Sequence, residues 1–298
     1  MNPNVPKLPA AVNLVKAFNE TPPEPDFVLP GLVAGTVGAL VSPGATGKSF
    51  WALAIGATVS GCVDILGIGI EKKGRVLVVC AEDPEIILEA RLHNLAKNIS
   101  IGDRLAVIER LDVMPAMALG IDFYSDAGLS WAQAIIERGR DCRLIVIDTL
   151  SRVHSGEEND RKDAAKVMRV LERIAAATGA AVVFLHHITK SVALGGQGDQ
   201  QQAARGSSVW IDESRWAGFL KIMDGAEAKK WSVDEELRRN FVRYGINKAN
   251  YCAPIMDIWL RRDVGGVLVP ADLTKTTPST KRANSTKKTE AGDEKSWL

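Results

Sequence analysis

The sequence predicts an α/β fold in which a mostly parallel, twisted sheet carries an antiparallel extension toward the C-terminus. Short apolar runs rich in β-branched residues alternate with stretches of helical periodicity, which is typical of a doubly wound parallel sheet. A glycine-rich segment, 42–49, separates one such run from a helical stretch. After about Val209 the pattern changes to tryptophan-rich and aromatic runs, which favour antiparallel strands added to the same sheet.

The expected elements follow one another from the N-terminus. Residues 1–30 are rich in proline around one possible short helix at 10–19, so we expect an extended arm before a single domain, 31–270. Within that domain the patterns predict strands at 36–41, 75–80, 105–108, 144–147, 181–185, 241–247 and 257–262, and helices at 48–60, 84–96, 128–138 and 163–178. Thr, Ser and Lys dominate residues 271–298, which we expect to form a disordered basic tail.

The bulk composition limits the classes of function. A chain of 298 residues, 46% hydrophobic and 24% charged, suits a soluble globular protein. A formal net charge of +1 argues against a surface that coats nucleic acid everywhere, so any DNA contact must be local, on loops. No apolar run approaches the roughly 20 residues that span a bilayer, and we expect a cytoplasmic protein without a membrane anchor. The cysteines form no CxxC pair or metal-ligand cluster and are expected to be free thiols: Cys62, Cys80, Cys142 and Cys252.

The segment 42–49, SPGATGKS, has the strand, loop and helix order of a phosphate-binding loop, or P-loop. Glycines let the backbone N–H groups of such a loop surround phosphate oxygens, and the helix that follows adds its positive end. Lys48 is expected to neutralise charge on the β- and γ-phosphates of ATP, and Ser49 to bind Mg²⁺. The pattern GxxxxGK[ST] is missed at one position, because Ser42 replaces the first glycine. The alternative is a glycine-rich turn with a chance Gly-Lys-Ser. The residues expected to bind the nucleotide are Gly44, Ala45, Thr46, Gly47, Lys48 and Ser49.

Two carboxylates follow other apolar runs, at the sheet edge where ligands bind in open α/β folds. Glu82 comes after the run 75–80 and is a candidate general base for an attacking water, although Glu82-Asp83-Pro84 also suits the start of a helix. Asp148 directly follows the run 144–147, which is the position of the carboxylate in a Walker B segment. We expect Asp148 to hold magnesium directly or through water.

Two adjacent histidines, His186 and His187, end a third apolar run and are expected to point to opposite sides of a strand. Zinc is not expected there, because no third ligand lies at a suitable spacing. His187 is a candidate sensor between the γ-phosphate and a loop. An ordinary position at a strand end remains the simpler interpretation of His186.

Several separated motifs occur together in one order along the chain. They are AGTVGALVSPG at 34–44, AEDP at 81–84, LHH at 185–187, GDQQQA at 198–203, RGSS at 205–208 and NKANY at 247–251. With these motifs the chain resembles the RepA-type hexameric replicative helicases of IncQ-like plasmids over roughly 27–270. The resemblance implies a RecA-like P-loop ATPase ring, with ATP and Mg²⁺ at subunit interfaces, that unwinds DNA ahead of a polymerase. It also implies the following roles: Lys48 and Ser49 bind the nucleotide, Glu82 activates water, Asp148 holds magnesium and His187 is the sensor.

The same resemblance implies an arginine finger, a cation that one subunit supplies to the γ-phosphate bound by its neighbour. This residue falls on Arg215, with Arg243 and Lys248 as weaker candidates. From the residues alone, an ordinary ion-pairing arginine would be the favoured interpretation of Arg215. Single-stranded DNA and further copies of the chain are implied as partners, together with a plasmid primase and an initiator protein.

Two long polar segments, 155–163 and 189–205, follow the runs that carry Asp148 and the histidines. Long loops in a compact domain are usually functional. The second contains Lys190 and Arg205 within a glycine-rich frame, which suits contact with single-strand phosphates. Neither loop has aromatic residues for base stacking, so we expect contacts to the DNA backbone that tolerate any sequence. The alternative is a solvated surface loop.

The sequence therefore favours ATP-driven DNA unwinding by a homohexamer. An ATP-dependent recombination or regulatory protein that binds DNA without unwinding it would share every nucleotide-site residue. A small-molecule kinase is less favoured, because the sequence has no recognisable acceptor pocket and a kinase does not explain the two long loops.

Overall fold

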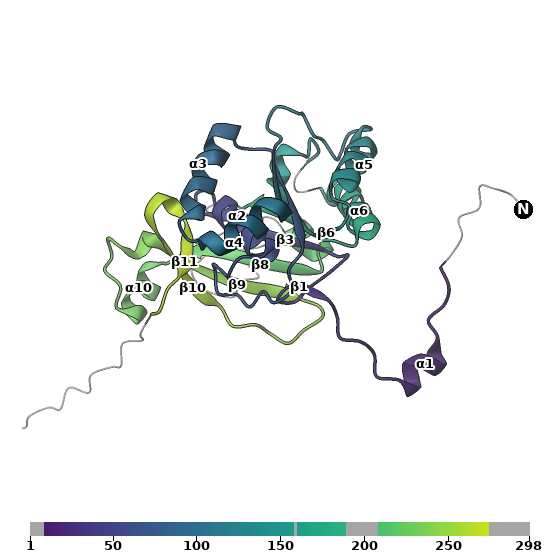
Figure 1. The fold of residues 1–298 in the computed structure, drawn as a ribbon, viewed down its shortest axis with the longest axis horizontal. Coiled ribbons are helices and arrows are strands. Elements are labelled where there is room, and N and C mark those ends of the chain that lie inside the picture. The colour runs from purple at the N-terminus through teal and green to yellow at the C-terminus, as the bar shows by residue number, and fades with distance from the viewer. Residues whose placement is uncertain (1–8, 158–159, 189–207, 274–298) are drawn as a thin grey trace, which may run out of the picture.

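The computed structural model describes residues 9–157, 160–188 and 208–273, and its centre is a nine-stranded sheet (Figure 1). The strand order is β11-β10-β9-β8-β3-β7-β6-β4-β5. Strands β8, β3, β7, β6, β4 and β5 run parallel, and β9, β10 and β11 continue the sheet antiparallel, so the expected fold class is confirmed. The bounds are β3 (Val37–Ser42), β4 (Arg75–Cys80), β5 (Leu111–Pro115), β6 (Cys142–Asp148), β7 (Ala181–His187), β8 (Trp216–Ile222), β9 (Phe241–Ala249), β10 (Ile258–Arg262) and β11 (Leu268–Pro270).

Helices cover both faces of the sheet (Figure 1). One face carries α2 (Lys48–Ser60), α3 (Glu85–Ala96) and α4 (Ile101–Arg110), and the other carries α5 (Gly128–Arg138), α6 (Arg161–Thr178) and α9 (Ser208–Glu213). The remaining short elements are α10 (Gly225–Trp231), η1 (Leu150–Arg152), η2 (Arg238–Asn240) and η3 (Val264–Gly266). Because both faces of the sheet are covered, its central strands are continuous apolar runs in the sequence.

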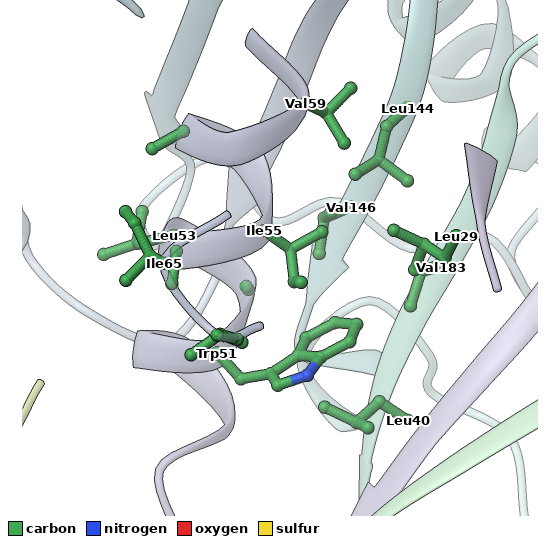
Figure 2. Packing of buried hydrophobic residues seen from close by; sticks show 14 of the residues in the cluster. Leu29, Leu40, Trp51, Leu53, Ile55, Val59, Ile65, Leu144, Val146 and Val183 are labelled. Carbon is green, nitrogen blue, oxygen red and sulfur yellow. The ribbon is translucent and has the colours of Figure 1, made fainter. Parts of the chain in front are cut away.

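Alternate residues of one strand belong to two separate cores, because side chains on a strand alternate between its faces. On β6, Leu144 and Val146 pack toward α2, as Figure 2 shows, whereas Ile145 and Ile147 belong to the core under α6. All four side chains are fully buried. At roughly 25 cal/mol per Å² of apolar surface, this two-sided burial is the main source of stability for the central strands. It also fixes the register that brings the strand ends together.

The register of the parallel strands places the polar strand ends at one edge. Ser42 at the end of β3 lies beside His187 at the end of β7, and Cys80 at the end of β4 lies beside Asp148 at the end of β6. Ser42 and His187, which are more than 100 positions apart in the sequence, are thereby adjacent at the carboxyl edge of the sheet.

The prediction of a strand at 105–108 is wrong. These residues lie within α4, whose N-terminus is capped by the Ser100 side chain, which accepts a hydrogen bond from the Asp103 amide at 3.1 Å. The edge strand β5 follows directly, at Leu111–Pro115. A four-residue apolar run fits a strand and one side of a helix equally well, so the cap decides the outcome.

The N-terminal segment lies largely apart from the body. Helix α1 (Leu14–Asn19), shorter than expected, has no buried residue and projects from the body on an extended arm (Figure 1). Strand β1 (Phe27–Leu29) pairs antiparallel with β2 (Leu32–Val33), and Val28 and Leu29 are buried. The packed part of the chain thus includes residues that we expected in the arm, 1–30. None of the described helices is long and apolar enough to cross a bilayer. Most of the expected tail, residues 274–298, lies outside the described residues.

Candidate nucleotide-binding site

The loop between β3 and α2 is closed by its own hydrogen bonds. The Thr46 hydroxyl donates to the Pro43 carbonyl at 2.7 Å, and the Ser42 hydroxyl donates to the same carbonyl at 3.0 Å. Gly47 has a φ of 110°, a region that favours glycine, and a Cβ there would lie 3.2 Å from Leu268. The positive φ therefore favours glycine at this position, and Leu268 of β11 leaves little room for a Cβ.

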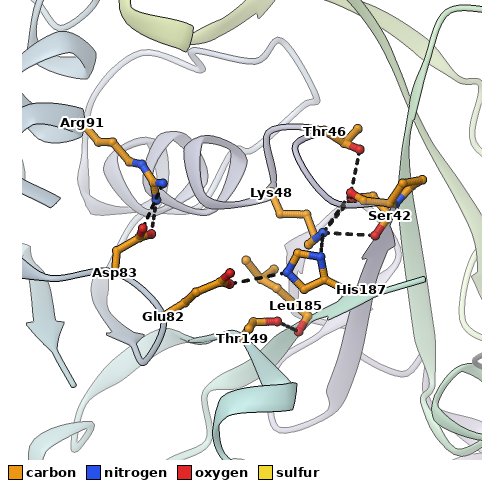
Figure 3. A network of polar contacts seen from close by, with 10 residues as sticks. Ser42, Thr46, Lys48, Glu82, Asp83, Arg91, Thr149, Leu185 and His187 are labelled. Atoms are coloured by element: carbon orange, nitrogen blue, oxygen red, sulfur yellow. Dashed lines mark hydrogen bonds and ion pairs between the residues drawn. The ribbon is translucent and has the colours of Figure 1, made fainter. Parts of the chain in front are cut away.

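Lys48 occupies the centre of this loop (Figure 3). Its Nζ donates to the Ser42 carbonyl at 3.1 Å, the Ser42 hydroxyl at 3.0 Å and the Pro43 carbonyl at 3.2 Å. Burial lowers the pKa of Lys48 to about 8, and the negative charges of Asp148 and Glu82 oppose this shift. A buried amine whose partners in the loop are uncharged oxygens is suited to bind an anion, because a phosphate stabilises its charged form.

Asp148 and Ser49 lie together beside the loop. Asp148 is 3% exposed, and burial raises its pKa to about 6, with Glu82 and Asp83 adding to the shift and a hydrogen bond to Ser49 opposing it. A hydroxyl and a carboxylate are oxygen ligands of the kind that Mg²⁺ prefers, and the crowding of negative charge would be relieved by a cation. Within the described residues no group of three or more His, Cys, Asp or Glu could hold a metal ion by itself. The donor set therefore fits a magnesium ion whose other ligands are phosphate oxygens and water.

His187 bridges the loop and the strand end of β4. Its Nδ1 lies 3.1 Å from Lys48 Nζ, and its Nε2 lies 3.5 Å from Glu82 Oε2 (Figure 3). Glu82 does not cap α3, because the N-cap residue is Pro84 and no side chain caps that terminus. The neighbouring Asp83 instead forms an ion pair with Arg91 of α3. Glu82 thus lies beside His187 and is not a helix cap.

His186 points into the protein on the opposite side of β7. It is buried, its Nδ1 has no hydrogen-bond partner in the described part of the chain, and its ring centroid lies 6.1 Å from that of Trp210. Burial lowers the pKa of His186 to about 4, with the charges of His187, Lys48 and His154 adding to the shift. A neutral, packed imidazole is consistent with the ordinary role expected for His186.

The three candidate arginine-finger residues differ in their contacts. Arg243 pairs with Glu227 at 3.3 Å and with Asp257 at 3.5 Å, and Lys248 Nζ donates to the last carbonyls of α9, those of Ile211 and Asp212. Arg215 is exposed, and its side chain makes no hydrogen bond or ion pair within the described residues. Among the three, Arg215 is the cation that is accessible to another molecule.

Arg215 also lies far from the P-loop of this chain. Its backbone N–H donates to the carbonyl of Val37, at the start of β3, whereas the P-loop follows Ser42 at the other end of that strand. Five steps along a strand advance roughly 17 Å at about 3.3 Å each. Arg215 and the P-loop therefore lie at opposite ends of β3 in this chain.

The proposed DNA contacts, Lys190 and Arg205, lie outside the described residues, as does the whole of the loop 189–205. The first loop, expected at 155–163, is shorter than expected because Asp160 caps α6 and the helix begins at Arg161. Residues 158–159 of that loop also lie outside the described part. The Ser155 hydroxyl donates to Asp122 at 2.6 Å, which ties the start of this loop to the body.

Two residues of the C-terminal hairpin contact the P-loop, and neither is indicated by a sequence motif. Arg262 Nη2 donates to the carbonyl of Ala45 at 2.7 Å, and Leu268 lies against Gly47. The two partners of the hydrogen bond are 217 positions apart, so no local pattern could reveal the contact.

A parallel sheet with a P-loop after β3, carboxylates after β4 and at the end of β6, and an antiparallel C-terminal extension defines a RecA-like P-loop ATPase. Residues 3–193, more than half of the chain, match the family model of the AAA domain, and the chain belongs to this family.

Two solved structures share the fold. The RadB recombinase superposes with a TM-score of 0.52 at 12% identity, covering 81% of this chain and 93% of that chain. The second structure, an ATPase domain, superposes with a TM-score of 0.52 at 14% identity, covering 80% of this chain and 85% of that chain. At these identities the likeness establishes the fold alone.

Proposed function

We propose that this protein is a ring-forming DNA helicase that hydrolyses ATP to translocate on single strands during plasmid replication. The observation that carries the proposal is the separation of two half-sites. Lys48, His187 and Glu82 are in contact at one edge of the sheet, and the accessible cation Arg215 lies near the other. Complementary half-sites at opposite edges suit a head-to-tail assembly of identical subunits, which closes into a ring when the rotation permits.

Each residue in the first half-site has a distinct role in hydrolysis. The loop amides and Lys48 bind the β- and γ-phosphates, and Ser49 and Asp148 hold the Mg²⁺, which neutralises charge on the phosphate oxygens. Glu82 accepts a proton from the water that attacks the γ-phosphorus, while the bond from that phosphorus to the ADP oxygen breaks. His187, in contact with both Lys48 and Glu82, senses whether the γ-phosphate is present.

The second half-site and the loops complete the motor. Arg215 stabilises charge on the γ-phosphate held by a neighbouring subunit, so hydrolysis depends on assembly. Lys190 and Arg205 bind single-strand phosphates in the channel of the ring, and a plasmid primase and initiator protein act with the helicase. With a net charge of +1, the surface as a whole attracts DNA only weakly, so these local contacts should dominate affinity.

A recombination or regulatory ATPase that binds DNA without unwinding it is the second candidate. The same fold in the RadB recombinase supports keeping it, because the sheet and the P-loop are compatible with either activity.

The two candidates differ in one assay. We expect the wild-type protein to unwind a forked DNA duplex in the presence of ATP and Mg²⁺. The Lys48→Ala variant, which loses charge compensation at the phosphates while keeping the loop backbone, should bind DNA but not unwind it. Closed rings should be visible in negative-stain images. DNA-dependent ATP turnover without strand separation, on filaments in place of rings, would favour the second candidate.

A further inference from the structure

We propose that Arg262 is a positioning residue for nucleotide binding, which holds the P-loop in its anion-binding shape through the carbonyl of Ala45. This inference rests on the proposed binding of ATP at the P-loop. It adds a residue from the C-terminal hairpin to a site whose other members belong to the parallel part of the sheet.

The first observation concerns the backbone at Ala45. Its φ of 59° lies in the left-handed region, which is costly for any residue with a Cβ. When residues in the right-handed and left-handed conformations alternate, their N–H groups turn inward and form a concave anion-binding surface. The carbonyl between them then points away from that surface. Ala45 is exposed and adopts this conformation without the steric freedom of glycine. Some other contact must therefore stabilise it.

The second observation is that Arg262 supplies that contact. Its Nη2 donates to the Ala45 carbonyl at 2.7 Å, a charge-assisted bond that fixes the direction of that carbonyl. On the same hairpin, Leu268 packs against Gly47, and Arg262 and Leu268 are directly paired across β10 and β11. The loop is thus held at two points by one pair of neighbouring residues.

The third observation is the charge of Arg262 itself. Within the described residues it pairs with no carboxylate, and burial alone lowers its pKa. A partly buried guanidinium of this kind, bound to a carbonyl of the phosphate loop, adds positive potential beside the site of an anion. Arg262 therefore stabilises both the shape of the loop and the charge of its ligand.

The test compares nucleotide affinity in four variants, using a fluorescent Mg-ADP analogue and a titration at equilibrium. We expect Arg262→Ala to raise the dissociation constant about tenfold, as the loss of one charge-assisted hydrogen bond does, while kcat at saturating ATP changes less than about twofold. Arg261→Ala is the matched control, because Arg261 is the preceding residue on β10 and is exposed. It should leave the dissociation constant unchanged.

The background Ala45→Gly separates positioning from direct contact. Glycine adopts the left-handed region at little cost, so Arg262→Ala should weaken binding only about two- to threefold in that background. An equal tenfold loss in both backgrounds would mean that Arg262 touches the nucleotide directly and would overturn the proposal, as would wild-type affinity in Arg262→Ala. If Arg262→Ala fails to fold, Arg262→Met, which keeps a long side chain and removes the charged donor, gives the same comparison in both backgrounds. A wild-type protein that does not bind the analogue at all would instead refute the proposed function.

Discussion

Glu82 and Lys48 lie against opposite nitrogens of one imidazole, so a movement of the His187 ring alters contacts with both side chains. In the proposed mechanism, Lys48 binds phosphate and Glu82 activates the attacking water. We expect Glu82→Gln to bind ATP nearly normally and to hydrolyse it about 10²- to 10⁴-fold more slowly, because the amide keeps the shape of the side chain and cannot accept the proton. Equilibrium binding and steady-state turnover measured together would test this.

The adjacent carboxylate provides the control for that experiment. Asp83 pairs with Arg91 and lies at the same strand exit, so Asp83→Asn should reduce turnover by less than about tenfold. If Glu82→Gln also abolished ATP binding, or if the two variants lost turnover equally, a structural role would replace the general base.

At the level of single residues, local spacing was sufficient to nominate Lys48, Ser49 and Asp148, because each occupies a fixed position after a strand or within a loop motif. Local spacing could not reveal Arg262, whose partner Ala45 is 217 positions away. It also could not show whether Glu82 caps α3, because that depends on where the helix begins in the folded protein.

A cluster of ion pairs connects the start of β1 to strand β6 of the central sheet. Asp26, just before β1, accepts hydrogen bonds at 2.8 Å from both terminal nitrogens of Arg143 on β6 and from Lys72. These partners, Arg143 first, hold the pKa of Asp26 well below its usual range. We expect Asp26→Asn to lower the free energy of unfolding at neutral pH by about 1–2 kcal/mol. The loss arises because Arg143 is largely buried and loses a bidentate partner, and the 44% exposure of Asp26 limits it.

The pH dependence of this pair has a definite sign. A carboxylate whose pKa is depressed by folding stabilises the protein above its unfolded pKa of about 4 and loses that contribution as pH falls toward the folded value. The difference between wild type and Asp26→Asn in chemical unfolding should therefore shrink as the pH is lowered below about 4. Asp112→Asn, which breaks a pair with the more exposed Arg138, should cost less. A constant difference at all pH values, or a larger loss in the control, would contradict this interpretation.

At the level of elements, long periodic stretches and buried strands were predictable, and α2 and α5 have the expected bounds. The error at α4 arose because four apolar residues do not define a period. The β1–β2 pair was missed because its strands are two and three residues long and prolines surround them.

The whole molecule presents a nucleotide half-site at one edge of its sheet and Arg215 near the other, an arrangement that the order of strands creates and that no single motif contains. The fold class followed from the alternation of elements along the sequence. The assembly that these half-sites suggest depends on surfaces of separate subunits, about which sequence periodicity carries no information. In the proposed assembly, one active site is built from two subunits of a DNA-dependent ATPase.

Complementation between two inactive variants tests this shared site most directly. Arg215→Ala subunits keep the P-loop half-site, and Lys48→Ala subunits keep the finger, so neither alone should turn over ATP at an appreciable rate. When the two are assembled together with single-stranded DNA, sites that combine the intact half of each should restore a measurable fraction of wild-type ATP turnover. A mixture as inactive as its components, or normal turnover by Arg215→Ala alone, would contradict a site shared between neighbouring subunits.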